Sequence, residues 1–147
     1  MGKIKVVPGM TYNVLEGKIA PVRGKYEDAG LDLCIQEDLV VEPGEVCYAK
    51  AGVAFDLPQG YFGQVVSRSG TPKNHGVTVI PTIIDSNYKD EISTIFVNTS
   101  KETKTFKPGD RLGQIIICKY YVFENEDIET LRKGARDSHE KFGSTGK

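Results

Sequence analysis

The sequence predicts an all-β domain, either a sandwich or a jelly roll, that ends in a polar tail. Short runs rich in β-branched and aromatic residues recur along the chain. Several runs alternate in character, as in Ile92, Thr94 and Phe96 against Ser93 and Ile95, which is typical of half-buried strands. Turn residues separate the runs, and only one short segment has the character of a helix.

In chain order, we expect strands within the ranges 3–7, 31–35, 45–57, 61–67, 76–81, 91–98 and 112–123. The residues between them agree, because Pro43-Gly44, Pro58-Gln59-Gly60 and Pro108-Gly109-Asp110 each favour a turn. The segment 124–134 is expected to form a short helix that stops at Gly134.

Length and charge restrict the function. A chain of 147 residues with 39% hydrophobic content suits one compact domain. Its net charge is −1, so it lacks the overall basic character of a duplex DNA binder, and no nucleic-acid partner is expected. Any anion that the protein binds must therefore be held by local groups.

The three cysteines, Cys34, Cys47 and Cys118, lie far apart and form no CxxC pair or zinc-ligand spacing with His75 and His139. They are interpreted as buried thiols in a reducing compartment. No run approaches the ~20 apolar residues of a membrane span, and the N-terminal segment lacks the apolar core of a signal peptide. A soluble, cytoplasmic protein without membrane contact is expected.

Three short motifs contain residue types suited to phosphate and water chemistry. Arg68 lies within SRSG (67–70), where forked guanidinium donors, a hydroxyl and loop amides can meet phosphate oxygens; a plain surface turn is the alternative. Asp85 directly follows the apolar pair Ile83-Ile84, and Tyr88 comes three positions later. Such a carboxylate can deprotonate water while the ring packs on a sugar, although a turn aspartate that caps its own backbone fits equally well.

The third motif, GDRLGQ (109–114), stands at a turn-to-strand junction. Its Asp110 and Arg111 are equally well explained as a structural ion pair, with Gln114 an ordinary strand residue. The tail 135–147 holds one aromatic residue, Phe142, among Gly, Ser, Thr and charges, and by itself it indicates a frayed terminus.

Taken in order, five motifs resemble those of the trimeric dUTPase family, over nearly the whole chain from Ile4 to Gly146. They are AGLDL (29–33), SRSG (67–70), IDSNY (84–88) with Glu91-Ile92, GDRLGQ (109–114) and FGSTG (142–146). Each motif is weak alone, but five in this order at family-like intervals rarely arise by chance.

The resemblance implies a jelly-roll-like β barrel in 1–134 that forms a homotrimer. The segment 135–147 would be an arm that closes over an active site of a neighbouring protomer. The implied reaction is hydrolysis of dUTP to dUMP and pyrophosphate by in-line attack of water on the α-phosphorus. Mg²⁺ is the implied cofactor, held mainly by the triphosphate and waters, with Asp32 reaching it through a water.

The resemblance also assigns roles to residues. Asp85 would activate the water and bond the sugar 3′-hydroxyl, and the ring of Tyr88 would leave no room for a 2′-hydroxyl. Ser69 and Gln114 would join Asp85 as catalytic residues. Substrate binding would also involve Arg68, Ser69, Gly70, Gln114, Arg136, Gly143, Ser144 and Thr145, with Phe142 closing over the uracil.

One segment departs from the family pattern, and two other functions stay open. Between His75-Gly76 and Asp85 the family usually has two more residues and a glycine hairpin that reads uracil; here Pro81 lacks an N–H and Thr82 replaces a glycine. A dCTP deaminase, or an enzyme with dual activity, would place a catalytic Glu at Ile95, so deamination is disfavoured. A regulatory or binding protein on the same scaffold is the second alternative.

Overall fold

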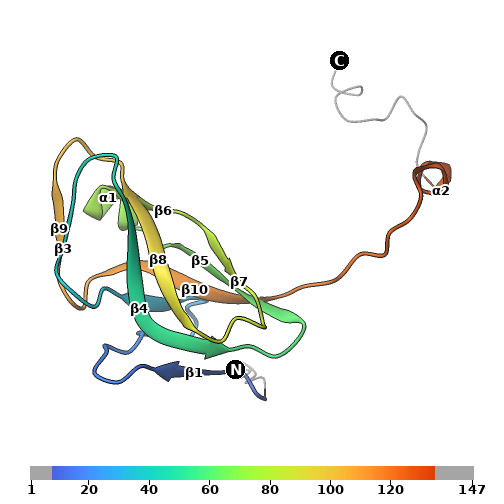
Figure 1. Ribbon diagram of the computed structural model, residues 1–147, viewed down its shortest axis with the longest axis horizontal. Helices are drawn as coiled ribbons and strands as arrows, with labels where there is room; N and C mark the ends of the chain where they lie inside the picture. The colour runs from blue at the N-terminus through green and yellow to red at the C-terminus, as the bar shows by residue number, and fades with distance from the viewer. Residues whose placement is uncertain (1–7, 135–147) are drawn as a thin grey trace.

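The computed structural model describes residues 8–134, which form two four-stranded sheets, a two-stranded ribbon and two short helices (Figure 1). The elements are β1 (Thr11–Val14), β2 (Leu31–Cys34), β3 (Leu39–Val41), β4 (Val46–Asp56), β5 (Tyr61–Ser67), α1 (Thr71–His75), β6 (Val77–Val79), β7 (Thr82–Ile84), β8 (Glu91–Asn98), β9 (Lys104–Phe106), β10 (Arg111–Lys119) and α2 (Ile128–Lys133). The sheets have the orders β1-β4-β8-β6 and β2-β10-β5-β7, and the ribbon is β3-β9. All pairs are antiparallel, and the jelly-roll-like, all-β prediction is confirmed.

The apolar core lies between the two sheets. Strand β8 shows how the sequence builds it, because every second side chain from Ile92 to Asn98 is buried while the residues between them are half-buried, as the alternation predicts. The opposite sheet contributes Val65 and Ile115, and Phe96 meets Phe106 of the ribbon edge-to-face at 5.5 Å. Each such large aliphatic side chain contributes roughly 1.5–3 kcal/mol by leaving water.

The longer strands occur where the sequence places them, whereas four of the short strands were missed. Strands β5 and β8 coincide with the predicted ranges, and β2, β4 and β6 lie inside theirs. The missed strands β1, β3, β7 and β9 have three or four residues each, too few to show an alternating pattern. The predicted strand 3–7 lies outside the described residues. The three predicted Pro-Gly turns are present, with positive φ at Gly44, Gly60 and Gly109.

Helix α1 was not predicted, because the sequence indicated a helix only within 124–134. Proline is at the start of the helix, where its missing N–H is not needed, and Gly76 ends it in the left-handed conformation at φ 67°. Helix α2 forms within the expected segment: Asp127 caps it by accepting from the Thr130 N–H, and Gly134 is the C-cap. No helix in residues 8–134 is long and apolar enough to cross a bilayer.

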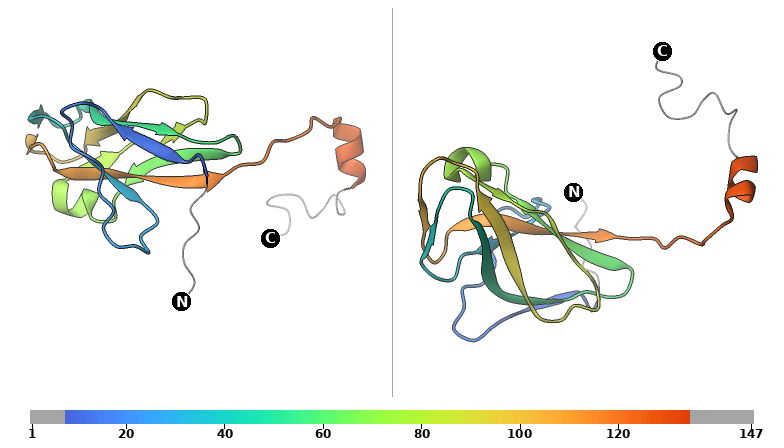
Figure 2. Two further views of the ribbon diagram at one scale, coloured as in Figure 1. Left: turned by 90° about the horizontal axis from the view of Figure 1, so that it is seen from below. Right: turned by 45° about the horizontal axis from the view of Figure 1, so that its top comes forward.

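Strand β10 ends earlier than predicted. The expected strand ran to Phe123, but pairing with β5 stops at Lys119, opposite Tyr61, and the last backbone bond joins the Tyr120 N–H to the Gly60 carbonyl. Beyond it the chain leads away from both sheets towards α2 (Figure 2). Tyr121, Val122 and Phe123 are 84%, 85% and 98% exposed, since no strand of the described chain lies beside them.

A buried amide ties the ribbon to the first sheet. The Asn98 side chain donates to the Val41 carbonyl at 2.9 Å and to the Glu102 carbonyl at 2.8 Å, and its oxygen accepts from the Ser100 N–H and hydroxyl. Asn98 is 1% exposed, so these bonds satisfy a polar group that has no access to water.

Candidate active site

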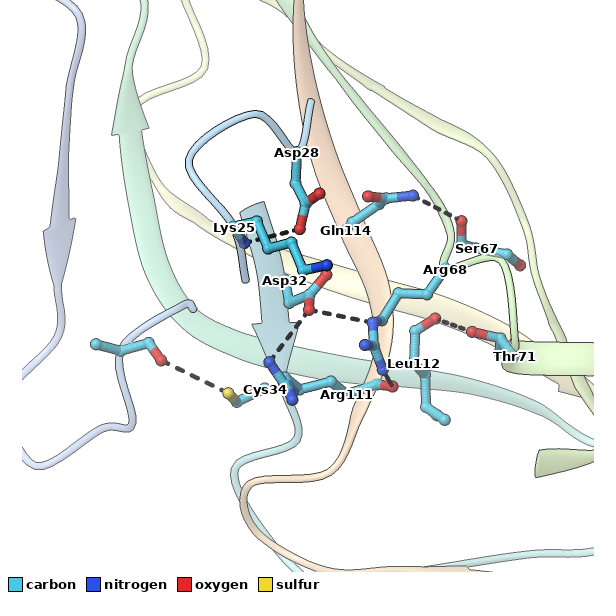
Figure 3. A network of polar contacts seen from close by, with 11 residues as sticks. Lys25, Asp28, Asp32, Cys34, Ser67, Arg68, Thr71, Arg111, Leu112 and Gln114 are labelled. Carbon is cyan, nitrogen blue, oxygen red and sulfur yellow. Dashed lines mark hydrogen bonds and ion pairs between the residues drawn. The ribbon is translucent and has the colours of Figure 1, made fainter. Parts of the chain in front are cut away.

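Three of the motifs converge at one end of the second sheet (Figure 3). Strand β10 lies between β2 and β5, with Gln114 opposite Asp32 on one side and Gly113 opposite Ser67 on the other. Because β5 ends at Ser67, the loop that carries Arg68 begins at this point. Residues far apart in the sequence therefore form one polar cluster, which we call the phosphate-side cluster: Asp32, Arg68, Ser69, Gly70, Arg111 and Gln114.

Asp32 is the centre of the phosphate-side cluster. Its Oδ2 lies 3.1 Å from Arg68 Nε and 3.2 Å from Arg111 Nη1. Arg68 Nη1 also donates to the Arg111 backbone carbonyl at 3.1 Å, so two contacts hold the guanidinium plane. The Asp32 side chain is 12% exposed and each arginine side chain 35%. This arrangement presents positive charge to solvent at the end of the sheet.

Gln114 is held by its surroundings. Its Nε2 donates to the Ser67 carbonyl at 3.1 Å. Gly30 packs against the same amide so closely that a Cβ there would lie 1.9 Å from Gln114 Oε1. The glycine of the first motif thus makes room for the glutamine of the fourth, and any larger residue at position 30 would displace the amide.

The loop after β5 is ordered by backbone and hydroxyl contacts. The Thr71 hydroxyl donates to the Leu112 carbonyl at 2.6 Å, and the Thr71 N–H donates to the Arg68 carbonyl. Ser69, between them, is exposed. The anchoring of Thr71 therefore directs the Ser69-Gly70 corner to solvent, where its hydroxyl and amides are accessible to an anion.

Asp85 and Tyr88 form a second, separate group. Asp85 directly follows β7, as predicted, and its exposed carboxylate makes no hydrogen bond to any residue in 8–134. A tight turn brings Tyr88 back, since its N–H donates to the Asp85 carbonyl, and its hydroxyl donates to the Glu91 carbonyl at 2.9 Å. Both residues line a largely apolar hollow of about 290 Å³ together with Thr82, Ile92 and Ile95. We call this hollow the nucleoside-side pocket.

The two groups lie at opposite ends of β5. Ile84 pairs with Gly63, which places Asp85 level with Phe62, whereas Arg68 follows the other end of that strand. At about 3.3 Å per residue, the six steps from 62 to 68 separate them by about 20 Å. Within one protomer, Asp85 and Arg68 therefore belong to two separate groups.

The proposed Asp110–Arg111 ion pair does not form. Asp110 instead accepts a hydrogen bond from the Lys107 N–H and closes its own turn, while Arg111 reaches Asp32. Sequence reasoning missed this partner because Asp32 and Arg111 are 79 positions apart and no local pattern connects them. Of the other predicted site residues, Arg136, Phe142, Gly143, Ser144 and Thr145 lie outside the described part of the chain.

The three cysteines are free thiols, and only one of them is buried as predicted. Cys34 is buried, but Cys47 and Cys118 are half-buried. Burial raises the pKa of the Cys34 thiol, with opposing smaller effects from Arg111, which lowers it, and Asp32, which raises it. Burial likewise raises the pKa of Cys47. Neutral thiols of this kind are poor nucleophiles, so neither enters the chemistry considered below.

Comparison with known proteins agrees with this geometry. The dUTPase family model matches residues 16–146. A deoxyuridine 5′-triphosphate nucleotidohydrolase of Anaplasma marginale is 40% identical over 124 residues, which cover 82% of this chain and 84% of the relative.

Two solved structures extend the likeness to three dimensions. A mutant dUTPase from phage phi11 of S. aureus, whose structure reveals the coordination of a structural Mg(II) ion, is 25% identical with a TM-score of 0.75, over 82% of this chain and 96% of that one. The Staphylococcus bacteriophage 80alpha dUTPase with dUPNHPP shares the fold at 22% identity, with a TM-score of 0.79 over 93% and 96% of the two chains. The class is thus that of all-β proteins with the dUTPase fold. With the match over 16–146, the chain belongs to the dUTPase family.

Proposed function

We propose that this protein hydrolyses dUTP to dUMP and pyrophosphate in active sites that are shared between the protomers of a homotrimer. Membership of the dUTPase family supports the reaction. The separation of Asp85 from Arg68 by about 20 Å supports sharing, because the water-activating carboxylate and the phosphate ligands must meet on one substrate. The phosphate-side cluster of one protomer then faces the nucleoside-side pocket of another.

Asp85 is the proposed general base. Its carboxylate is exposed at the end of a strand whose last residue, Ile84, is buried, so the group is accessible but rigidly supported. It orients a water for in-line attack on the α-phosphorus and accepts the proton as the new P–O bond forms. The pyrophosphate leaves from the opposite side of that phosphorus.

Tyr88 is the proposed sugar-selective residue. Its hydroxyl is committed to the Glu91 carbonyl, which holds the ring at the wall of the nucleoside-side pocket. A ring fixed in this way packs on a deoxyribose and excludes a 2′-hydroxyl by shape.

The phosphate-side cluster supplies the remaining groups. Arg68 neutralises phosphate charge, the Ser69 hydroxyl and the Gly70 amide donate to phosphate oxygens, and Gln114 provides an oriented amide. We assign Arg136, Phe142, Gly143, Ser144 and Thr145 to the arm that closes over the site, with Phe142 on the uracil. Closure excludes water and brings further donors to the triphosphate.

Mg²⁺ is the proposed cofactor, and the residues present fit it. Within residues 8–134 no three His, Cys, Asp or Glu side chains gather as a metal cage. Mg²⁺ does not require one, because it keeps several waters and binds substrate phosphates. The Asp32 Oδ2 is used by two arginines, but its Oδ1 accepts no hydrogen bond within those residues and is suited to hold a water of the ion. The ion would supply charge neutralisation on the triphosphate.

Two surface features support self-association. The outer face of the first sheet has an apolar patch: Tyr48 pairs with Ile95 and Val46 with Val97 across β4 and β8, and Tyr48 is 71% exposed. The segment 121–123 adds large apolar side chains with no partner in the described chain. Exposed apolar surface of this kind marks an interface in a protein of this size.

Deamination of dCTP is the weaker candidate. A deaminase of this fold needs a carboxylate at position 95, and Ile95 there lines the nucleoside-side pocket without one. Glu91 lies at the same pocket, but its Oε2 already accepts the Gly52 N–H. Pyrophosphate and ammonia release should therefore be measured on dUTP, dCTP, dTTP and UTP, each with and without Mg²⁺. Ammonia from dCTP would overturn the proposal.

The sharing of sites has its own test. Asp85→Asn and Arg68→Ala variants should each be nearly inactive, because each loses one half of every site. When the two are unfolded, mixed and refolded together, some sites combine an intact Asp85 with an intact Arg68 from another protomer. Recovery of about a quarter of wild-type activity or less is expected, the exact share depending on random assembly. No recovery would mean that both residues act from one protomer.

A further inference from the structure

We infer that Arg111 is a positioning residue that neutralises Asp32 and so leaves the positive charge of Arg68 available to the substrate triphosphate. The inference rests on the proposed function, in which Arg68 binds phosphate. The observation that carries it is the contact of two guanidinium groups with one carboxylate oxygen, Asp32 Oδ2, at 3.1 and 3.2 Å. In Figure 3 the two arginines approach Asp32 from β10 and from the loop after β5.

The contacts fix the orientation of Arg68. Its Nε meets Asp32, and its Nη1 donates to the Arg111 backbone carbonyl. A guanidinium has five N–H donors in a rigid plane, so Nη2 and the second hydrogen of Nη1 remain available for an anion. The Asp32 carboxylate and the Arg111 carbonyl thus hold Arg68 through Nε and Nη1 and leave Nη2 for phosphate.

The balance of charge explains why a second arginine, Arg111, contacts Asp32. An Asp32–Arg68 pair alone sums to zero and would attract a triphosphate weakly. With Arg111 the three groups sum to +1, since one carboxylate faces two guanidinium groups. Asp32 is only 12% exposed, so water screens its charge poorly and a neighbouring cation must offset it. Arg111 supplies that offset, and no other cation is paired with Asp32 in residues 8–134.

The placement of Arg111 suits this role. It begins β10 directly after the Pro108-Gly109-Asp110 turn and pairs with Cys34, two residues from Asp32 on β2. The carboxylate of the preceding residue, Asp110, accepts a hydrogen bond from the Lys107 N–H. It therefore does not compete with Asp32 for the Arg111 guanidinium. The fourth motif therefore contributes a charge-balancing side chain as well as Gln114.

Equilibrium binding without Mg²⁺ tests the inference, because the proposed contact of Asp32 with hydrated Mg²⁺ is then absent. The probes are a non-hydrolysable dUTP analogue and, as an uncharged control, deoxyuridine, both measured by calorimetry at low salt. Arg111→Met should weaken analogue binding about tenfold or more, as expected for loss of a charge-assisted contact. Arg111→Lys keeps the positive charge beside Asp32 and should stay within about threefold of wild type. Deoxyuridine binding should not change in either variant.

Removal of the opposing charge separates electrostatics from simple structure. Adding Asp32→Asn to Arg111→Met should recover most of the lost analogue affinity, because the carboxylate that cancelled Arg68 is gone. Asp32→Asn alone should bind the analogue at least as tightly as wild type. This double variant also has no unpaired buried charge, so it keeps the test valid where Arg111→Met folds poorly by circular dichroism.

Three results would overturn the inference: wild-type affinity in Arg111→Met, no recovery in the double variant, or Arg111→Lys as weak as Arg111→Met. Failure of the proposed function gives a different result. In that case wild type itself neither binds the analogue nor releases pyrophosphate from dUTP, whatever the variants do.

Discussion

Asp85, the proposed general base, is exposed, and its carboxylate makes no hydrogen bond within the described chain. Asp85→Asn should therefore leave folding and nucleotide binding nearly intact. It should lower kcat by about 10²–10⁴-fold, since an amide cannot accept the proton of the attacking water. Steady-state kinetics on dUTP check this, with melting temperature as the control. A kcat near that of wild type would contradict the assignment of the base.

Tyr88 provides a test of sugar selection at the same scale. Tyr88→Ala removes the ring from the nucleoside-side pocket and should narrow the preference for dUTP over UTP while also weakening dUTP binding. Tyr88→Phe keeps the ring and loses only the bond to the Glu91 carbonyl, so it should retain most of the preference. The ratio of kcat/KM for the two nucleotides is the measurement. An unchanged ratio in Tyr88→Ala would show that another group sets the choice.

Asn98 provides the corresponding test of stability. Asn98→Ala removes four hydrogen bonds at a buried position, two of them to the Val41 and Glu102 carbonyls. The expected loss is about 2–4 kcal/mol of unfolding free energy. Thr99→Ala, at the adjacent exposed position, should change stability by less than about 0.5 kcal/mol. Urea unfolding of both variants gives the comparison, and equal effects would contradict the role of Asn98 as a link to the ribbon.

At the scale of elements, the segment 135–147 differs most from the sheets in composition, since it has one aromatic residue among Gly and charged side chains. Deletion of 135–147 should lower kcat and not merely raise KM, because contacts to the leaving pyrophosphate strengthen as charge builds on it. The β domain should keep its melting temperature, since the core lies between the two sheets. Full activity in the 1–134 protein would mean that the segment has no part in the reaction.

Helix α1 and strand β10 show how much local signals predict about elements. The signals for α1, Pro72 near its start and Gly76 after its end, were in the sequence, but a helix of five residues carries no periodicity to reveal it. For β10, the apolar pattern continues through 120–123 although pairing ends at Lys119. An apolar, β-rich pattern indicates that a segment is suited to a strand. The segment forms one only where a partner strand lies beside it.

At the scale of the whole molecule, the apolar patch on the outer face of the first sheet should be covered in solution. We expect a trimer by light scattering at micromolar concentration. Replacement of Tyr48 and Val46 by glutamate places charge on this face and should give monomers. Those monomers should be folded but inactive, because Asp85 and Arg68 then have no complementary half-site. A fully active monomer would overturn both the trimer and the shared site.

The sequence by itself determined the fold class, the longer strands, the turns and the position of Asp85 after an apolar strand. These are local properties: alternation over seven or eight residues, turn-forming Pro-Gly pairs, and the order of short motifs. The same local reasoning offered an Asp110–Arg111 ion pair as one of two interpretations, and the structure does not contain it. Local reasoning had no means of connecting Arg111 with a residue 79 positions away.

Only the tertiary structure decided which motifs meet. The order of strands in the second sheet brings Asp32, Arg68, Arg111 and Gln114 to one end and places Asp85 beyond the other. Strand register is set by the packing of whole sheets on a common core, which no single segment encodes. The distance of about 20 Å along β5 follows from that register. A list of motifs suggests one site within one chain, whereas their placement in space supports the proposal that two protomers complete it.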